Sequence, residues 1–143
     1  MSNTHLEFLA RQAVFARGAF GPGERRNGVP AHIRKELDEI AACETAEERA
    51  TEWVDVVLLA QDGLLRSVRE ALREQLVEHK DKPMVFIGTK CVARFGEPTT
   101  DYVAMFALEL LTGKRDKNEL RDWPNWREAS EDNPIEHVKG THD

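Results

Sequence analysis

The sequence has few of the features that mark exported or membrane proteins. It contains only two cysteines, Cys43 and Cys91, among 143 residues. It has no uninterrupted apolar run near the ~20 residues needed to cross a bilayer. Residues 1–5 lack the basic stretch and apolar run of an export signal. We therefore expect a cytoplasmic protein with free thiols and no membrane partner.

Positive charge is also scarce. The chain has 20 Lys and Arg against 26 Asp and Glu, a net charge of -6, which argues against extended binding to nucleic-acid phosphates. A single nucleotide is not excluded, because metal ions and a few basic residues can hold it. The five histidines lack metal-ligand spacing, neither cysteine has a neighbouring base, and no Gly-Lys-Ser/Thr follows the glycine-rich stretch. Zinc, thiol and P-loop chemistry therefore have no support.

The patterns that are present predict helices. Thr4 begins a motif of capping-box form, so we place a first helix from Thr4, as its N-cap, to about Arg17. Residues 20–28 hold three glycines and a proline and predict a loop. Pro30 suits the first turn of a second helix. An apolar stripe on that helix is expected to face the core: Ile33, Leu37 and Ile40.

A second capping box at Thr45 opens a third helix, which we expect to reach at least Arg66 and to continue toward Lys80. The short connection near Cys43 makes the second and third helices antiparallel neighbours. Residues 53–60 are apolar on nearly every side, as in a helix that is buried all round. One chain of this length has difficulty surrounding such a helix, so we expect a homo-oligomer, either a dimer or a tetramer.

The remaining segments complete the expected architecture. Residues 84–87 are apolar and predict either a strand or a buried turn. Thr99 or Thr100 caps a late helix, which Gly113 ends or kinks. We predict one domain, an all-α antiparallel helical bundle of four to five main helices. It spans residues 1–143, with an insertion or arm near 67–102 and a loose tail over 132–143.

Two acid-x-x-acid motifs carry the strongest functional signal: Glu36-Leu37-Asp38-Glu39 and Glu52-Trp53-Val54-Asp55. Residues three apart lie on one face of a helix, about 5–6 Å apart at Cβ. Antiparallel pairing of the two helices brings the four carboxylates around one point. Uncompensated anions repel each other there, so we predict a divalent cation. An all-carboxylate set favours Mg²⁺ or Mn²⁺ over Zn²⁺.

Each motif also has a simpler interpretation. Glu36 and Glu39, with His32 on the same flank and Lys35 on the other, could be a solvated helix edge. Asp55 argues against this, because it sits in an apolar stretch where an unpaired buried carboxylate is costly. A salt bridge is the alternative, but that stretch contains no Lys or Arg. A bound cation explains both motifs together.

The chemistry of such a site points to phosphoric anhydride hydrolysis, because a bound cation activates water and offsets charge on phosphoryl oxygens. Lys114, Lys117 and Arg121 share a face of the late helix and could hold distal phosphates, or form an ordinary basic helix end. The glycine-rich loop could present backbone N–H groups to an anion or a base edge. Asp62 either orients one of these basic residues or is exposed.

These motifs resemble the MazG-like superfamily of all-α nucleoside triphosphate pyrophosphohydrolases, specifically its phage and bacterial dATP/dGTP diphosphohydrolase branch. The matching segments are Phe20-Gly21-Pro22-Gly23, His32 to Leu37, Glu52 to Val57 with Asp62-Gly63, Lys117 to Arg127, and Ile135-Glu136-His137-Val138. They cover roughly residues 8–66 and 104–138. The stretch from about Ser67 to Tyr102 departs from the branch, which joins these helices more briefly.

The resemblance implies an oligomeric helical bundle that converts a purine dNTP, dGTP or dATP, to the monophosphate and pyrophosphate. Glu36, Glu39, Glu52 and Asp55 would hold Mg²⁺ or Mn²⁺, with Glu36 or Glu39 as general base toward the water. Substrate contacts are expected from nine residues: Gly21, Gly23, His32, Lys35, Lys114, Lys117, Asn118, Arg121 and Trp123. Two alternatives remain: a broad house-cleaning pyrophosphatase, and a non-catalytic helical oligomerisation module.

Overall fold

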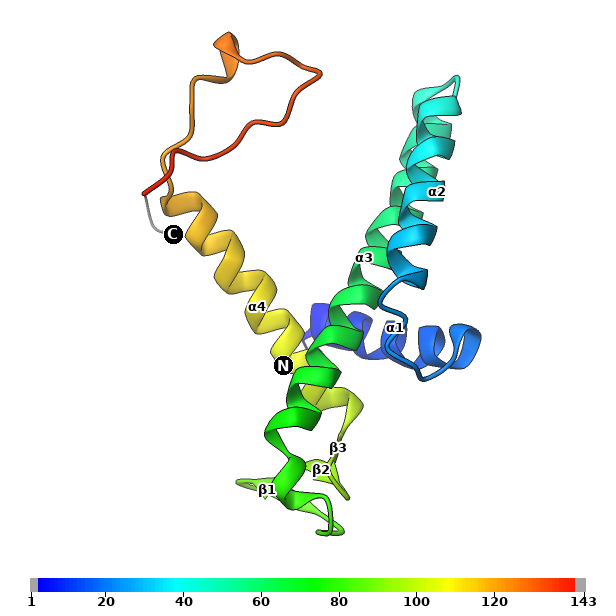
Figure 1. Ribbon diagram of the computed structural model, residues 1–143, viewed down its shortest axis with the longest axis vertical. Coiled ribbons are helices and arrows are strands. Elements are labelled where there is room, and N and C mark those ends of the chain that lie inside the picture. The colour runs from blue at the N-terminus through cyan, green and yellow to red at the C-terminus, as the bar shows by residue number, and fades with distance from the viewer. Residues whose placement is uncertain (1–2, 141–143) are drawn as a thin grey trace. The chain divides into compact units, whose positions relative to one another are not determined.

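The computed structural model describes residues 3–140, and most of them are helical (Figure 1). The chain divides into two compact units, one ending at Leu108 and the other beginning at Glu109. A small three-stranded sheet accompanies the helices, so the protein is mainly α rather than all-α. Within the described residues no helix is both long and apolar enough to pass through a bilayer.

Three helices build most of the first unit: α1 (Thr4–Phe20), α2 (Gly28–Ala42) and α3 (Ala46–Gln75). α2 runs antiparallel along the first half of α3, as the short connection predicts (Figure 1). The capping box of α3 is confirmed: Glu48 N–H donates to Thr45 Oγ1 at 3.1 Å, and the Glu48 carboxylate accepts from Thr45 N–H. The predicted cap of α1 is wrong by one residue, because Asn3 Oδ1 accepts the first N–H groups.

A short 3-10 turn (Val77–His79) and an antiparallel sheet lie between α3 and α4 (Thr100–Leu120). The strands are β1 (Val85–Ile87), β2 (Lys90–Arg94) and β3 (Glu97–Pro98), paired in that order. The apolar run at 84–87 is therefore a strand. Gly96 has φ +77°, and a Cβ there would lie 3.0 Å from the Lys80 backbone, so glycine suits this turn. Most of the segment expected as an insertion thus consists of the end of α3 and this sheet.

The hydrophobic core of the first unit joins α1, the second half of α3 and the first turns of α4. Its buried members are Leu9, Ala13, Leu65, Val68, Leu72, Val103, Ala104 and Ala107. Thr99 Oγ1 accepts from Tyr102 N–H at 3.3 Å and caps α4. The core therefore lies at one end of α3, away from the half that pairs with α2.

The apolar stretch on the first half of α3 is expected to need a partner subunit, and within the chain Trp53, Val54 and Val57 are 50%, 53% and 51% exposed. The expectation that the apolar stripe of α2 faces the core is wrong for Leu37, which is 42% exposed, whereas Glu36 is buried. The α2–α3 pair extends beyond the core, and the side chains on its outer surface stay exposed among the described residues. A partner subunit that would cover them remains a prediction.

The second unit comprises the last turns of α4 and the segment after it, with a 3-10 turn at Trp126–Glu128. α4 continues through Gly113 to Leu120, so of the two alternatives at Gly113 the end of the helix is wrong. The Val138 N–H donates to the Asp122 carbonyl at 2.8 Å, which ties the later segment to the residues just after the helix. The tail expected over 132–143 has no regular structure up to residue 140, and residues 141–143 lie outside the described part.

Candidate functional site

Antiparallel pairing of α2 and α3 brings three of the four predicted carboxylates together. Glu36, Glu39 and Glu52 each place one oxygen within 4.8 Å of the others. Asp55 does not join this set. It lines the neighbouring cavity together with Glu36. Of the four carboxylates predicted to surround one point, three do so, and Asp55 lies outside the cluster.

The burial of these carboxylates differs from what the sequence indicated. Asp55, predicted to be buried, is exposed in the chain by itself, and Glu52 is half-buried. Glu36 is only 6% exposed, so the simpler interpretation of a solvated helix edge is wrong for Glu36. Glu36 faces α3, whereas Asp55 is an exposed residue on the first half of α3. Glu36 is therefore the desolvated acid of the site.

Two residues predicted as substrate contacts pair with the cluster. His32 Nε2 lies 3.1 Å from Glu36 Oε1, and Lys35 Nζ lies 3.1 Å from Glu39 Oε1, each four residues apart on α2. The prediction that Lys35 faces away from the acids is wrong, because positions four apart on a helix lie side by side. Glu36 Oε2 is buried and has no hydrogen-bond partner.

The electrostatics of the cluster are uneven. Desolvation and the charges of Glu39, Asp55 and Glu36 raise the pKa of Glu52. A hydrogen bond from Lys35 lowers the pKa of Glu39, and the same contact raises the pKa of Lys35. Cys43 is close by, but burial and the charges of Glu52 and Glu48 raise its pKa, which disfavours the nucleophilic thiolate. One lysine therefore offsets only part of the negative charge.

The donor set fits a divalent cation. Three carboxylates converge, and one buried oxygen, Glu36 Oε2, lacks a hydrogen-bond partner. Burial and the neighbouring carboxylates raise the pKa of Glu52. A hard cation with oxygen ligands would satisfy the unpaired oxygen and remove the repulsion. Among the residues that the structure describes, this is the one group of three or more His, Cys, Asp or Glu side chains with such proximity.

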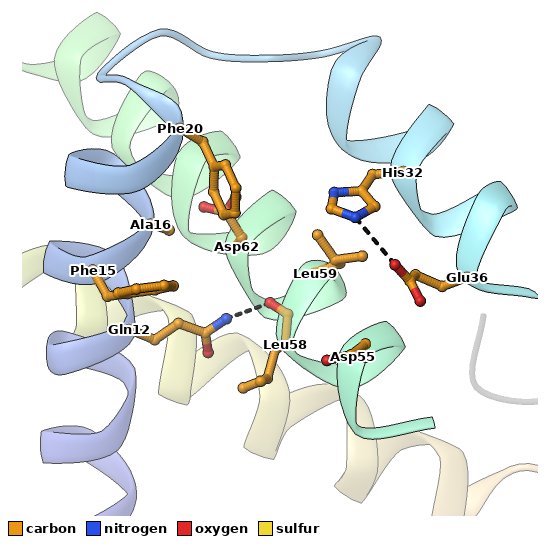
Figure 2. A pocket seen from close by; sticks show the side chains of 10 residues that line it. All are labelled: Gln12, Phe15, Ala16, Phe20, His32, Glu36, Asp55, Leu58, Leu59 and Asp62. Carbon is orange, nitrogen blue, oxygen red and sulfur yellow. Dashed lines mark hydrogen bonds and ion pairs between the residues drawn. The ribbon is translucent and has the colours of Figure 1, made fainter. Parts of the chain in front are cut away.

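A cavity of about 180 Å³ lies beside the carboxylates, between α1, α2 and α3 (Figure 2). Most of its wall is apolar. The Phe20 ring meets Phe15 and His32 edge-to-face, each at 6.3 Å between centroids. The lining residues are Gln12, Phe15, Ala16, Phe20, His32, Glu36, Asp55, Leu58, Leu59 and Asp62.

A buried ion pair holds the glycine-rich loop at this cavity. Arg66 Nε donates to Asp62 Oδ1 at 2.8 Å, and both side chains are 4% exposed. Arg66 also donates to the carbonyls of Gly21 at 2.9 Å, Gly23, and Ala16 at 3.2 Å. Gly21 and Gly23 thus contribute carbonyl acceptors to this contact.

The alternative that Asp62 is exposed is wrong, because its side chain is buried and pairs with Arg66. Arg66 was missed altogether, although its spacing of four from Asp62 is a detectable signal. Its loop partners could not be read from the sequence, since 45 residues separate Arg66 from Gly21.

The other predicted substrate contacts belong to the second unit. Arg121 Nη1 donates to Asn118 Oδ1 at 2.8 Å, and Trp123 Nε1 donates to the Asn118 carbonyl at 2.8 Å. Lys114 is exposed, and Lys117 is half-buried. These contacts order the end of α4, and a role toward substrate remains a prediction for all five residues.

Comparison with protein-family models, with curated proteins and with solved structures finds no match for this chain. Its function therefore has to be argued from the residues and their geometry. Three observations on the chain bear on it: the carboxylate cluster, the unpaired oxygen of Glu36, and the adjoining cavity.

Proposed function

We propose that this protein is a metal-dependent nucleoside triphosphate pyrophosphohydrolase of the MazG-like, antiparallel helical type. It would cleave a purine dNTP between the α and β phosphates and release the monophosphate and pyrophosphate. One observation carries the proposal: three carboxylate oxygens within 4.8 Å of one another, one belonging to a buried glutamate, beside a cavity. Such a cluster suits a cation that binds phosphate oxygens.

Glu36, Glu39 and Glu52 would hold Mg²⁺ or Mn²⁺, and Asp55, which lines the same cavity as Glu36, would be the fourth acid of the site. The bound cation would supply activated water and charge neutralisation at the phosphoryl oxygens. His32 fixes one oxygen of Glu36. Whichever of Glu36 and Glu39 is not fully engaged as a metal ligand would take the proton from the attacking water, because a fully engaged ligand is a poor base.

Positively charged side chains that could bind the triphosphate lie beside the carboxylate cluster and in the second unit. Lys35 already lies beside Glu39, where its ammonium could move to an entering phosphate oxygen. Lys114, Lys117, Asn118 and Arg121 would contact the distal phosphates, from the same chain or from a neighbouring subunit. The exposed apolar face of α3, with Trp53, Val54 and Val57, supports a homo-oligomer in which a second copy covers it.

A steady-state screen of the common NTPs and dNTPs, with released pyrophosphate measured with and without Mg²⁺, tests the proposal. We expect turnover of dGTP or dATP only with the metal. Glu39→Gln should lower kcat by about 10²-fold or more. Glu78→Gln removes an exposed carboxylate outside the cluster and should leave the rate unchanged.

Each other outcome of the screen identifies a different function. A preference for pyrimidine or damaged nucleotides would indicate a house-cleaning pyrophosphatase. No pyrophosphate from any substrate, with any divalent metal, would contradict an enzymatic role and favour an oligomerisation module. Normal turnover by the Glu39→Gln variant would show that the site is assigned wrongly.

A further inference from the structure

The two ends of α3 carry opposite charge. Residues 80–95, the basic hairpin, follow α3 and include β1 and β2; they hold four Lys and Arg against one Asp. Residues 38–55, the acidic tip, comprise the α2–α3 turn and the helical turns beside it; they hold seven Asp and Glu against one Arg. Both surfaces belong to the first unit. α3 has 30 residues, so about 45 Å separates its ends (Figure 1).

Most of these charges have no partner of opposite sign within the described chain. The four cations of the hairpin are exposed and form no ion pair with a described residue: Lys80, Lys82, Lys90 and Arg94. At the tip, four acids that belong neither to the carboxylate cluster nor to its cavity are likewise exposed and without an ion pair: Asp38, Glu44, Glu47 and Glu48. The two ends of α3 therefore offer complementary charge to another molecule.

The same surfaces also expose apolar side chains. Those on the hairpin are Met84, Phe86, Ile87 and Phe95. Between hairpin and tip, α3 carries an apolar stripe whose members alternate at spacings of three and four residues: Ala50, Trp53, Val57, Ala60 and the half-buried Leu64. This spacing is typical of a seam between two paired helices. Exposed apolar surface of this extent marks an interaction site.

Charge decides how a second copy of α3 would lie along this stripe. In a parallel pair, each acidic tip faces the other tip and each basic hairpin faces the other hairpin, so like charges meet. In an antiparallel pair, each hairpin faces the tip of the other copy, so opposite charges meet at both ends. Complementary charges fix the orientation of an interface in this way.

Distances along α3 agree with the antiparallel pair. The stripe is centred on Val57. Arg69 lies twelve residues after it and contacts Glu97 at 3.2 Å, which marks the position of the sheet. Thr45 lies twelve residues before it and caps α3 at the tip. Both are about 18 Å from the centre along the helix axis, so the sheet of one copy comes level with the tip of the other.

We propose that the basic hairpin docks on the acidic tip of a second copy, across a two-fold axis near Val57, so that the dimer makes this contact twice. Such an isologous contact closes at two subunits. An anionic membrane would also attract the hairpin, but it would repel the tip and leave the stripe uncovered. A second copy covers all three surfaces. The inference adds named surfaces and an orientation to the homo-oligomer of the proposed function, and it does not depend on turnover.

Sedimentation of the full chain at micromolar concentration measures the dimer. We expect the wild type to dimerise at low salt, with a dissociation constant that rises about tenfold between about 50 and about 500 mM salt. Lys82→Glu with Lys90→Glu reverses the hairpin, and Glu44→Lys with Glu47→Lys reverses the tip. Each double variant should raise the dissociation constant about tenfold or more at low salt, because like charges then meet at both contacts.

Mixing the two reversed proteins in equal amounts separates docking from damage to the fold. The mixed dimer has opposite charges at both contacts, so it should form with about wild-type affinity, whereas mixing cannot restore a misfolded protein. Glu131→Lys with Asp132→Lys is the matched control. It changes the net charge as much as the tip variant does, at exposed positions outside both surfaces, and it should keep the wild-type affinity.

The inference is overturned if the wild type is monomeric at low salt, if its affinity does not fall with salt, or if folded variants dimerise like the wild type or fail to recombine on mixing. The salt series on the wild type keeps the test decisive where a variant does not fold. A monomer that binds vesicles of phosphatidylcholine and phosphatidylserine through the hairpin would assign that surface to a membrane instead. Pyrophosphate release by a monomer would refute this inference alone, and the expected dimer without pyrophosphate release would refute the proposed function alone.

Discussion

Replacing Arg66 with methionine removes the centre of a buried polar network. The guanidinium is 4% exposed and donates to Asp62 and to the carbonyls of Ala16, Gly21 and Gly23. Methionine fills a similar volume but donates nothing. The variant leaves the Asp62 carboxylate buried with neither oxygen paired, and it releases the glycine-rich loop from α3.

The size of the effect follows from which groups lose their partners. A buried charge whose partner is removed costs about 3–5 kcal/mol. Gly21 and Gly23 are partly or fully exposed, so water can replace Arg66 at their carbonyls and adds little to the cost. In a chain of this length about 3–5 kcal/mol lowers Tm by about 10–15 °C.

Thermal and denaturant unfolding of a double-mutant cycle measure this cost. Arg66→Met should be strongly destabilised, whereas Asp62→Leu with Arg66→Met removes both charges and should recover most of the loss, to within about 1–2 kcal/mol of wild type. A single variant within about 1 kcal/mol of wild type would refute the reasoning. So would a double variant less stable than the single one, because the cost would then not come from the stranded carboxylate.

Two further predictions concern the other charged groups. Glu36→Gln keeps an acceptor for His32 but removes one of three clustered anions. Mg²⁺ at a hundredfold excess over Kd should raise the Tm of the wild type by about 5–10 °C, and this gain should disappear in the variant. An equal gain in both proteins would exclude Glu36 as a ligand. Burial raises the pKa of Glu97, but hydrogen bonds and charge from Arg73 and Arg69 outweigh it and hold the pKa below its ordinary value. Because the folded-state pKa is depressed, this stabilisation is present at neutral pH and lost as pH falls through that pKa. Glu97→Gln should therefore lower the free energy of unfolding by about 1 kcal/mol at pH 7, a small change because the carboxylate is 44% exposed. In acid, urea unfolding should show no difference in stability between variant and wild type. A difference that stays constant with pH would contradict this account.

Local signals predicted the elements that place the carboxylates. The capping box at Thr45 and the short connection before it fix α2 and α3 as antiparallel neighbours, which is enough to bring Glu36, Glu39 and Glu52 together. These features depend on residues close in sequence. The nature of the run at 84–87 did not follow, because its strand pairing depends on β2.

The sequence could not rank the carboxylates by burial. An apolar stretch indicates that a helix is covered, but not whether the covering surface belongs to the same chain. For this reason the prediction that Asp55 is buried, which was based on its apolar neighbours Trp53, Val54 and Val57, is not met in the chain by itself. Glu36 is the buried acid because it faces α3. Hydrophobic periodicity assigns buried positions to apolar residues, so it does not predict a charged residue at this contact between helices.

The position of the core explains how the fold can tolerate an uncompensated acidic site. Leu65, Val68 and Leu72 carry the packing of α3 at its second half, whereas Glu52 and Asp55 lie on its first half, two turns or more before the first of these core residues. Repulsion among the carboxylates therefore acts on the α2–α3 pair and leaves the packing around Leu65 and Leu72 intact. Asp62 stands between the two halves, and its pair with Arg66 links the cavity to the packed end of the helix. Stability and binding thus depend on different turns of α3, so substitutions in the carboxylate cluster should change ligand affinity far more than they change folding.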